Sequence, residues 1–220
     1  MLWYQYVSLG CLGVCFGACL WHFFRLIRLG KPKDLSKKSG NMARAQWYAY
    51  TTAMLPAQKE SAYLHIPTFT AGIFFHIGTL VSLLLFVVFF FVKPEWLHDN
   101  LALAILILLL SLGLTVSAVC GFSLFLKRVF SKKLRELSTV DDYLSNFLTT
   151  LFQVFTAFYL ILGNNFEVYY FVLASVLWLY MPVGKLRHVV YFFAARYHLG
   201  FFYGWRNSWP PPAQPSYSED

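Results

Sequence analysis

Long runs of apolar residues, separated by polar and charged segments, dominate the pattern of this chain. Each run is close to the roughly 20 residues that an α-helix needs to cross a hydrocarbon core about 30 Å thick. The five runs cover approximately residues 2–24, 66–92, 101–126, 143–162 and 166–183. The pattern predicts an all-α integral membrane bundle of five transmembrane helices.

The fourth run is the most polar of the five. Its first half carries four amide or hydroxyl side chains: Asn146, Thr149, Thr150 and Gln153. Polar side chains inside a span usually face other helices or a bound group rather than lipid. We therefore expect these side chains to face the interior of the bundle.

The positions of Lys and Arg predict the orientation of the chain. Residues 25–59 carry eight of these basic residues, residues 127–135 carry five and residues 185–206 carry four, whereas residues 93–100 carry one and residues 163–167 carry none. Basic residues favour the cytoplasmic side of a membrane. This bias predicts a multi-pass protein of the cell inner (plasma) membrane with its amino terminus outside and its carboxyl terminus in the cytoplasm. It also accounts for the net charge of +8, so no nucleic-acid partner is needed.

The composition agrees with this class of protein, since 58% of the 220 residues are hydrophobic and 13% are charged. A soluble domain of this length cannot bury so much apolar surface. Because basic residues follow the first run and do not precede it, we expect a retained anchor and not a cleaved signal peptide.

Three of the four cysteines lie on one stripe of the first run, interleaved with glycines. They are Cys11, Cys15 and Cys19, among Gly10, Gly13 and Gly17. Small residues allow membrane helices to approach closely, so this stripe favours helix packing over a metal site. The chain has no CxxC pair, and iron–sulfur clusters, if used, must come from a partner.

The chain is expected to form a membrane domain over residues 1–205 and a Pro-rich, disordered cytosolic tail over residues 206–220. Between the first two runs, residues 41–55 predict a short helix at the headgroups or against another subunit. After the fifth run, residues 185–202 contain helix formers with alternating basic and aromatic residues. They predict that the fifth helix continues into the cytoplasm.

His76 lies well inside the second apolar run and is the strongest candidate redox ligand. Haem b needs two axial nitrogens, which a membrane bundle can supply from facing helices. Counted from the interfacial aromatics Trp96 and Tyr170, His76 is 20 residues and His188 is 18 residues toward the cytoplasm. At 1.5 Å per residue these separations are roughly 30 and 27 Å, which predicts two ligands at similar depth. The two depths agree only when they are counted from Trp96 and Tyr170. Alternatively, His76 hydrogen-bonds a neighbouring helix.

A second pair of histidines leaves open a second haem. His65 precedes His76 by eleven residues and His198 follows His188 by ten, so each would share a helix face with the first ligand. Pro67 suits the first turn of a helix and would leave His65 outside the helical register. One haem or two therefore remain as alternatives. Arg187 and Arg196, with Lys185, are candidates for binding the haem propionates, although cytosolic flanks are basic in any case.

Three segments of the chain resemble the gamma subunit of respiratory nitrate reductase and its relatives, the membrane cytochrome b subunits of heterodisulfide-reductase-like and sulfite-reduction-linked complexes. The segments are Phe75-His76-Ile77-Gly78, the basic stretch Leu126–Ser131, and Pro182, Leu186 and His188. The resemblance extends to five spans at a similar total length with the amino terminus outside. It implies haem b ligated by His76 and His188, oxidation of quinol or reduction of quinone, and a cytosolic iron–sulfur subunit.

The chain departs from that family at the ligands of the outer haem. Phe86 stands ten residues after His76, and Tyr170 stands eighteen before His188, where the family has histidines. The outer haem is therefore expected to be absent, and a quinone site nearer the cytosolic half is favoured.

The sequence thus predicts a membrane cytochrome b that exchanges electrons with menaquinone or ubiquinone as one subunit of a membrane oxidoreductase. No constellation for the substrate chemistry itself is present in the chain. The alternative is a haem-free structural anchor of a redox complex. A small transporter is disfavoured, because ionisable residues are nearly absent from the middle of the spans.

Overall fold

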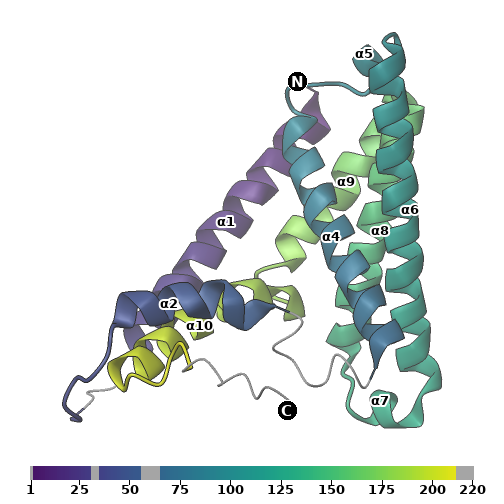
Figure 1. Cartoon of the computed structure of the whole chain (residues 1–220). Helices are drawn as coiled ribbons and strands as arrows, with labels where there is room; N and C mark the ends of the chain where they lie inside the picture. Colours follow the sequence, from purple (N-terminus) through teal and green to yellow (C-terminus); the bar gives the residue numbers. More distant parts are fainter. Residues whose placement is uncertain (1, 31–34, 56–64, 212–220) are drawn as a thin grey trace, which may run out of the picture. The chain divides into compact units, whose positions relative to one another are not determined.

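The computed structural model describes residues 2–30, 35–55 and 65–211, apart from the side chains of residues 97 and 98, and every regular element among them is helical (Figure 1). The prediction of an all-α protein is confirmed for this part of the chain. Four described helices are long and apolar enough to cross a membrane: α1 (Trp3–Leu29), α4 (Ile66–Val88), α6 (Leu101–Phe130) and α8 (Val140–Leu162). Helix α9 (Asn164–Tyr180) adds a fifth span if it is taken together with the helical segment Lys185–Trp205.

The chain divides into two compact units, which are described separately. Unit 1 comprises Met1–Ala18 and His65–Arg187, and unit 2 comprises Cys19–Leu64 and His188–Asp220. Helix α1 therefore contributes its first part to unit 1 and its last part to unit 2. The division falls inside the membrane domain predicted over residues 1–205. The predicted tail is described only as far as residue 211.

In unit 1, α8 packs against α4, α6 and α9 and forms the centre of the bundle (Figure 1). Two short helices lie in the connections: α5 (Glu95–His98) before α6, and α7 (Lys132–Glu136) between α6 and α8. The start of α8 is fixed by a capping box, in which the Thr139 and Asp142 side chains each bond to the other residue's backbone N–H. Unit 1 thus has two ends, one at α5 and the other at α7, which we call the α5 end and the α7 end.

Two of the four polar side chains of α8, Thr149 and Gln153, are buried as the sequence predicts, whereas Asn146 and Thr150 are half-buried. Thr149 is 5% exposed and Gln153 is fully buried, and Gln153 hydrogen-bonds to α4. The opposite faces of the helices carry exposed apolar residues, such as Leu108 and Leu112 on α6. This inverted distribution, with polar groups inside and apolar groups outside, is expected of a bundle surrounded by lipid.

The prediction of one continuous fifth helix is wrong. Helix α9 ends at Tyr180, residues 181–184 form turns, and a 3₁₀ turn, η3 (Lys185–Arg187), precedes α10 (His188–Trp205). Pro182 has no N–H to donate to the preceding turn and therefore interrupts the ladder. The depth of His188 was calculated from Tyr170 with a rise of 1.5 Å per residue, which assumes one continuous helix between them. Because the helix is interrupted, this calculation no longer supports a similar depth for His76 and His188.

In unit 2, α2 (Met42–Tyr50) and the 3₁₀ turn η1 (Thr52–Met54) form the short helix predicted over residues 41–55. Helix α2 packs against α10 of the same chain. Small residues line the contact: Ala45 and Ala49 are fully buried, and a Cβ added at Gly204 would lie 2.7 Å from the Cβ of Ala45. A small residue at every fourth position allows this close approach.

The glycines of α1 do not make such an approach. A Cβ built at Gly10, Gly13 or Gly17 has no heavy atom of the described chain within 4 Å beyond its own helix backbone and chain neighbours. The predicted close approach at the glycines is therefore not formed within the described chain, whereas Cys15 of the same stripe is buried.

Candidate functional site

His76 lies near the middle of the 23-residue helix α4, on the face that points away from the unit 1 bundle. Its side chain is exposed, and its exposed neighbours are apolar, including Ile73, Ile77 and Leu80. Phe75 and Gly78 lie on the opposite, buried face. The structure thus displays one imidazole on an otherwise apolar surface.

The backbone that precedes His76 is held by buried polar side chains from two other helices. The Ser117 hydroxyl of α6 donates to the Phe74 carbonyl at 2.8 Å, and the Gln153 amide of α8 donates to the Phe75 carbonyl at 3.0 Å. Gln153 also donates to the Thr79 hydroxyl at 2.7 Å. Such bonds form where water is absent and donors must find protein acceptors. They fix the direction in which the His76 side chain leaves the helix.

The same turn of α4 is pressed closely against α6. A Cβ added at Gly78 would lie 2.0 Å from the Ser117 hydroxyl oxygen, and one added at Gly121 would lie 2.5 Å from the Phe75 ring. Glycine is therefore required at both positions for the helices to approach this closely. We call residues 74–79, with Ser117, Gly121 and Gln153, the His76 clamp.

The four predicted iron ligands are divided between the units. His65 and His76 belong to unit 1, and His188 and His198 belong to unit 2. Each predicted pair therefore takes one residue from each unit, and both pairings stay predictions. His188 is the first residue of α10, and its side chain is exposed.

The two residues of the second pair have local roles in the structure. His65 is the N-cap of α4 with φ −140° and ψ 50°, so the register shared with His76 does not extend to it. His198 is half-buried, its Nε2 lies 3.2 Å from the Leu26 carbonyl oxygen of α1, and its ring packs against Gly30. An imidazole that bonds the last carbonyls of a helix stabilises its carboxyl end.

The two arginines predicted to bind propionates lie on either side of the unit boundary. Arg187 ends η3 and is exposed. Arg196 is half-buried, and its guanidinium carbon lies 5.2 Å from the centroid of the Phe192 ring. This distance is within the range of a cation–π contact.

An aromatic cluster surrounds Phe86 and Tyr170, the positions at which the family that the sequence resembles has histidines. Phe86 and Tyr170 are fully buried, and their ring centroids are 6.2 Å apart. Tyr170 stacks on Tyr159 at 4.9 Å and on Phe152 at 5.6 Å. Direct ring contacts leave no slot for a porphyrin between positions 86 and 170.

A buried polar contact near the α5 end was missed by the sequence reasoning. Glu167 of α9 is 2% exposed, its Oε1 accepts from Gln5 of α1 at 2.6 Å, and its Oε2 lies 3.9 Å from the Lys93 ammonium. With its amide oriented to pair donors with acceptors, Asn164 bridges Glu167 and Glu95 at 3.2 and 3.3 Å. The residues come from distant segments, so their spacing carried no signal. The sequence indicates this contact only through Glu167 itself, a carboxylate at the start of an apolar run.

Near the α7 end, an ion-pair cluster ties α6 and η3 to the start of α8. Asp142 pairs with Arg128 at 2.7 Å and with Lys185 at 2.5 Å. Lys185 lies three residues before His188 in the sequence, so this cluster fixes the chain just before the predicted ligand.

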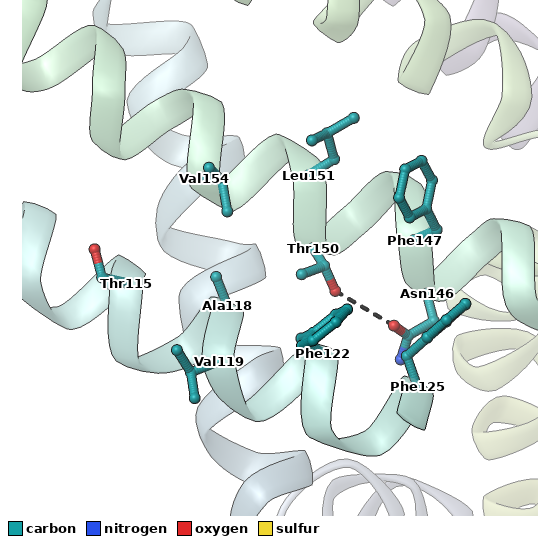
Figure 2. A pocket seen from close by; sticks show the side chains of 10 residues that line it. All are labelled: Thr115, Ala118, Val119, Phe122, Phe125, Asn146, Phe147, Thr150, Leu151 and Val154. Carbon is teal, nitrogen blue, oxygen red and sulfur yellow. Dashed lines mark hydrogen bonds between the residues drawn. The ribbon is translucent and has the colours of Figure 1, made fainter. Parts of the chain in front are cut away.

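A groove opens between α6 and α8 in the half of unit 1 nearer the α7 end (Figure 2). Its volume is about 320 Å³, within the usual range for small-ligand sites. Phe122, Phe125 and Phe147 supply most of its aromatic lining, and Asn146 and Thr150 are among its few polar side chains.

The described residues thus form an all-α structure with four helices, or five with the bent pair, long and apolar enough to cross a membrane, and one of these helices carries an exposed histidine. Comparison with protein families, with curated proteins and with solved structures finds no match for this chain. Among the described residues, no group of three or more His, Cys, Asp or Glu side chains could hold a metal ion. A haem with two axial histidines needs no such group.

Proposed function

We propose that this chain is the haem b-containing membrane subunit of a respiratory redox complex, related to the gamma subunit of nitrate reductase. It transfers electrons between the membrane quinone pool and a cytosolic iron–sulfur subunit. The observation that carries the proposal is the exposed His76 imidazole, set near the middle of an apolar helix on a backbone held by Ser117 and Gln153. These two bonds to the carbonyls of residues 74 and 75 hold the helical turn from which the His76 side chain leaves.

His76 and His188 are the proposed axial ligands. Both side chains are exposed, so each is accessible to a group outside its own unit. The exposed residues around His76 are apolar, which suits the apolar face of a porphyrin. When bound, haem supplies a one-electron Fe(III)/Fe(II) couple. The exposed Arg187, adjacent to His188, and Arg196 are the proposed partners of its propionates.

One haem is favoured over two. The structure gives His198 another role, at the carboxyl end of α1, and it gives His65 a position outside the helical turns of α4. The aromatic cluster around Phe86 and Tyr170 supports the absence of an outer haem. The proposed stoichiometry is therefore one haem per chain.

The proposed setting follows from the distribution of basic residues. The amino terminus is outside, the α7 end faces the cytoplasm, and the protein lies in the cell inner membrane. The iron–sulfur partner docks on that basic cytosolic side, and menaquinone or ubiquinone reaches the protein from the bilayer.

Reduced-minus-oxidised visible spectra of the purified protein test the proposal. The wild type should show a b-type signal at one haem per polypeptide, and His76→Ala or His188→Ala should each abolish it. His22→Ala is the matched control, since His22 is a half-buried histidine of α1 that should leave the spectrum unchanged. A wild type without haem, or a signal that survives both substitutions together, contradicts the proposal. A folded, haem-free protein that still binds its complex would support the structural anchor instead.

A further inference from the structure

The last turns of α1 carry a hollow whose lining combines two arginines with apolar side chains. Its volume is about 430 Å³, and its described lining is Trp21, Phe24, Arg25, Arg28 and Leu29, which all belong to unit 2. Spacings of three and four residues place these side chains on one face of the helix. All five are exposed, Trp21 to 68%. Charged and apolar groups thus lie side by side on an exposed face of α1.

The other side of the same turns is held within unit 2 by α10. The His22 ring packs edge-on against the Tyr191 ring, with their centroids 6.4 Å apart. The His198 Nε2 lies 3.2 Å from the Leu26 carbonyl oxygen, and the His198 ring packs against Gly30. Because α10 fixes one side of this helix end, the exposed side that carries the two arginines has a defined shape.

The positive charge of this unit is not balanced among its described residues. Residues 19–30, 35–55 and 188–211 contain no Asp or Glu, since the four acidic residues of unit 2 lie outside these ranges. The same ranges contain seven basic residues: Arg25, Arg28, Lys37, Lys38, Arg44, Arg196 and Arg206. The ion pairs found in the described chain all lie in unit 1, at Asp142 and Glu167. The excess of positive charge selects an anionic ligand for unit 2.

The position of the arginines along α1 indicates where such a ligand lies. Helix α1 has 27 residues and is therefore about 40 Å long, whereas a hydrocarbon core is about 30 Å thick. Arg25 and Arg28 are the only Lys, Arg, Asp or Glu residues of this helix, and they lie in its last two turns. That end therefore extends into the headgroup region, where Trp side chains such as Trp21 are also favoured.

We propose that this hollow binds the headgroup of an anionic phospholipid of the bilayer, such as phosphatidylglycerol. The lipid phosphate accepts N–H bonds from the guanidinium groups of Arg25 and Arg28. Its glycerol and first acyl carbons pack on the exposed apolar side chains of the same face. An acidic protein surface would match the charge alone, whereas the lipid matches both the charge and the apolar residues. The inference does not depend on haem and assigns a class of lipid to unit 2.

Native mass spectrometry of the full-length protein in detergent, titrated with phosphatidylglycerol, tests this site, because it resolves individual bound lipids. The wild type should bind the first phosphatidylglycerol more tightly than the first phosphatidylcholine. Each of Arg25→Gln and Arg28→Gln should raise the dissociation constant of the first phosphatidylglycerol about fivefold.

The matched control is the double variant Lys37→Gln/Lys38→Gln. It removes the same charge from unit 2 as Arg25→Gln/Arg28→Gln does, at exposed positions outside the hollow, and should change the dissociation constant less than about twofold. Equal losses in the two double variants, or a wild type without preference for phosphatidylglycerol, overturn the inference. Unchanged lipid binding in Arg25→Gln/Arg28→Gln, with loss of an acidic subunit that copurifies with the wild type, would assign this face to a protein and also overturns it.

A photoreactive phosphatidylglycerol provides a second measurement, on the wild-type protein in phosphatidylcholine vesicles. It should label a peptide that covers residues 21–29, and excess phosphatidylglycerol should protect this peptide whereas excess phosphatidylcholine should not. Labelling confined to other segments, or equal protection by both lipids, overturns the site. Neither measurement uses haem, so a haem-free protein with protected labelling would refute the proposed electron transfer and leave the lipid site standing.

Discussion

Two turns of the same helix, ten residues apart, have different surroundings. Around His76, helix α4 is held to its neighbours by side-chain hydrogen bonds to its carbonyls, and the His76 side chain points outward. Around Phe86, the α4 side chain points inward and lies among the rings of Phe90, Phe171 and Trp178. The first turn holds the backbone in place and exposes the proposed ligand, whereas the second fills the interior with packed rings.

The difference shows how one helix can expose a polar side chain at one turn and fill another turn with packed rings. An exposed ligand needs a rigid backbone beneath it, which buried polar contacts provide. A position without a ligand is most stable when large side chains pack tightly there. In this chain, Phe86 and Tyr170 occupy the positions at which the family that the sequence resembles has histidines, and their rings are in contact.

The largest effect on stability is expected at the Phe86 turn. Phe86→Ala removes a fully buried ring and leaves a cavity, and it should lower the free energy of unfolding by about 3–5 kcal/mol. Phe91→Ala is the control, since Phe91 is 77% exposed and should cost less than about 0.5 kcal/mol. Denaturant titration in detergent measures both. The amount of haem per folded protein should remain at the wild-type value. Equal losses of unfolding free energy in Phe86→Ala and Phe91→Ala would contradict the tight packing described around Phe86.

Gly78→Ala changes the turn around His76 and should have an intermediate effect on stability. The added Cβ would meet the Ser117 hydroxyl and push α4 away from α6, at a cost of about 1–3 kcal/mol. Gly72→Ala is matched to it on the same helix, because a Cβ there meets nothing within 4 Å. That variant should be neutral or slightly stabilising.

The electron paramagnetic resonance spectrum of the proposed haem provides a further measurement on these two glycine variants. Gly78→Ala should alter the low-spin electron paramagnetic resonance of the haem, because the clamp sets the orientation of His76, and Gly72→Ala should not. A spectrum that is the same in both variants would show that the clamp does not position the ligand.

The smallest effect is expected from Ser117→Ala. It deletes the single hydrogen bond to the Phe74 carbonyl and should cost about 0.6 kcal/mol, with an upper limit near 1.7 kcal/mol for such bonds in membranes. Ser123→Ala removes a hydroxyl that bonds only within α6, and it should be close to neutral. Thermal unfolding in detergent, followed by circular dichroism, compares the two. A larger loss of thermal stability in Ser123→Ala than in Ser117→Ala would contradict the stabilising role of the Ser117 hydrogen bond.

The sequence predicted the helices well because hydropathy runs directly report segments that must satisfy their own backbone in lipid. It also predicted which face of α8 is buried, since Thr149 and Gln153 are too polar for lipid. It failed at the end of α9, although Pro182 was visible, because the alternating pattern after it was interpreted as a continuing helix. The effect of Pro67 on His65 was predicted correctly.

The candidate site was predicted only in part. His76 was found because one imidazole in an apolar run is conspicuous. The Ser117 and Gln153 contacts join residues 43 and 78 positions apart, and the Gln5–Glu167 contact spans 162. No local pattern encodes such pairs. The groove likewise arises from how α6 approaches α8, which depends on Gly121 and on the rings of both helices.

The pairing of α2 with α10 has a consequence for the order of events during synthesis. Gly200 and Gly204, which pack against α2, are made about 150 residues later than Ala45 and Ala49. Until then this face of α2 has no matching surface within unit 2. A chain that stops just short of residue 200 should therefore be recognised by quality-control proteases at α2, about 150 residues before the missing segment.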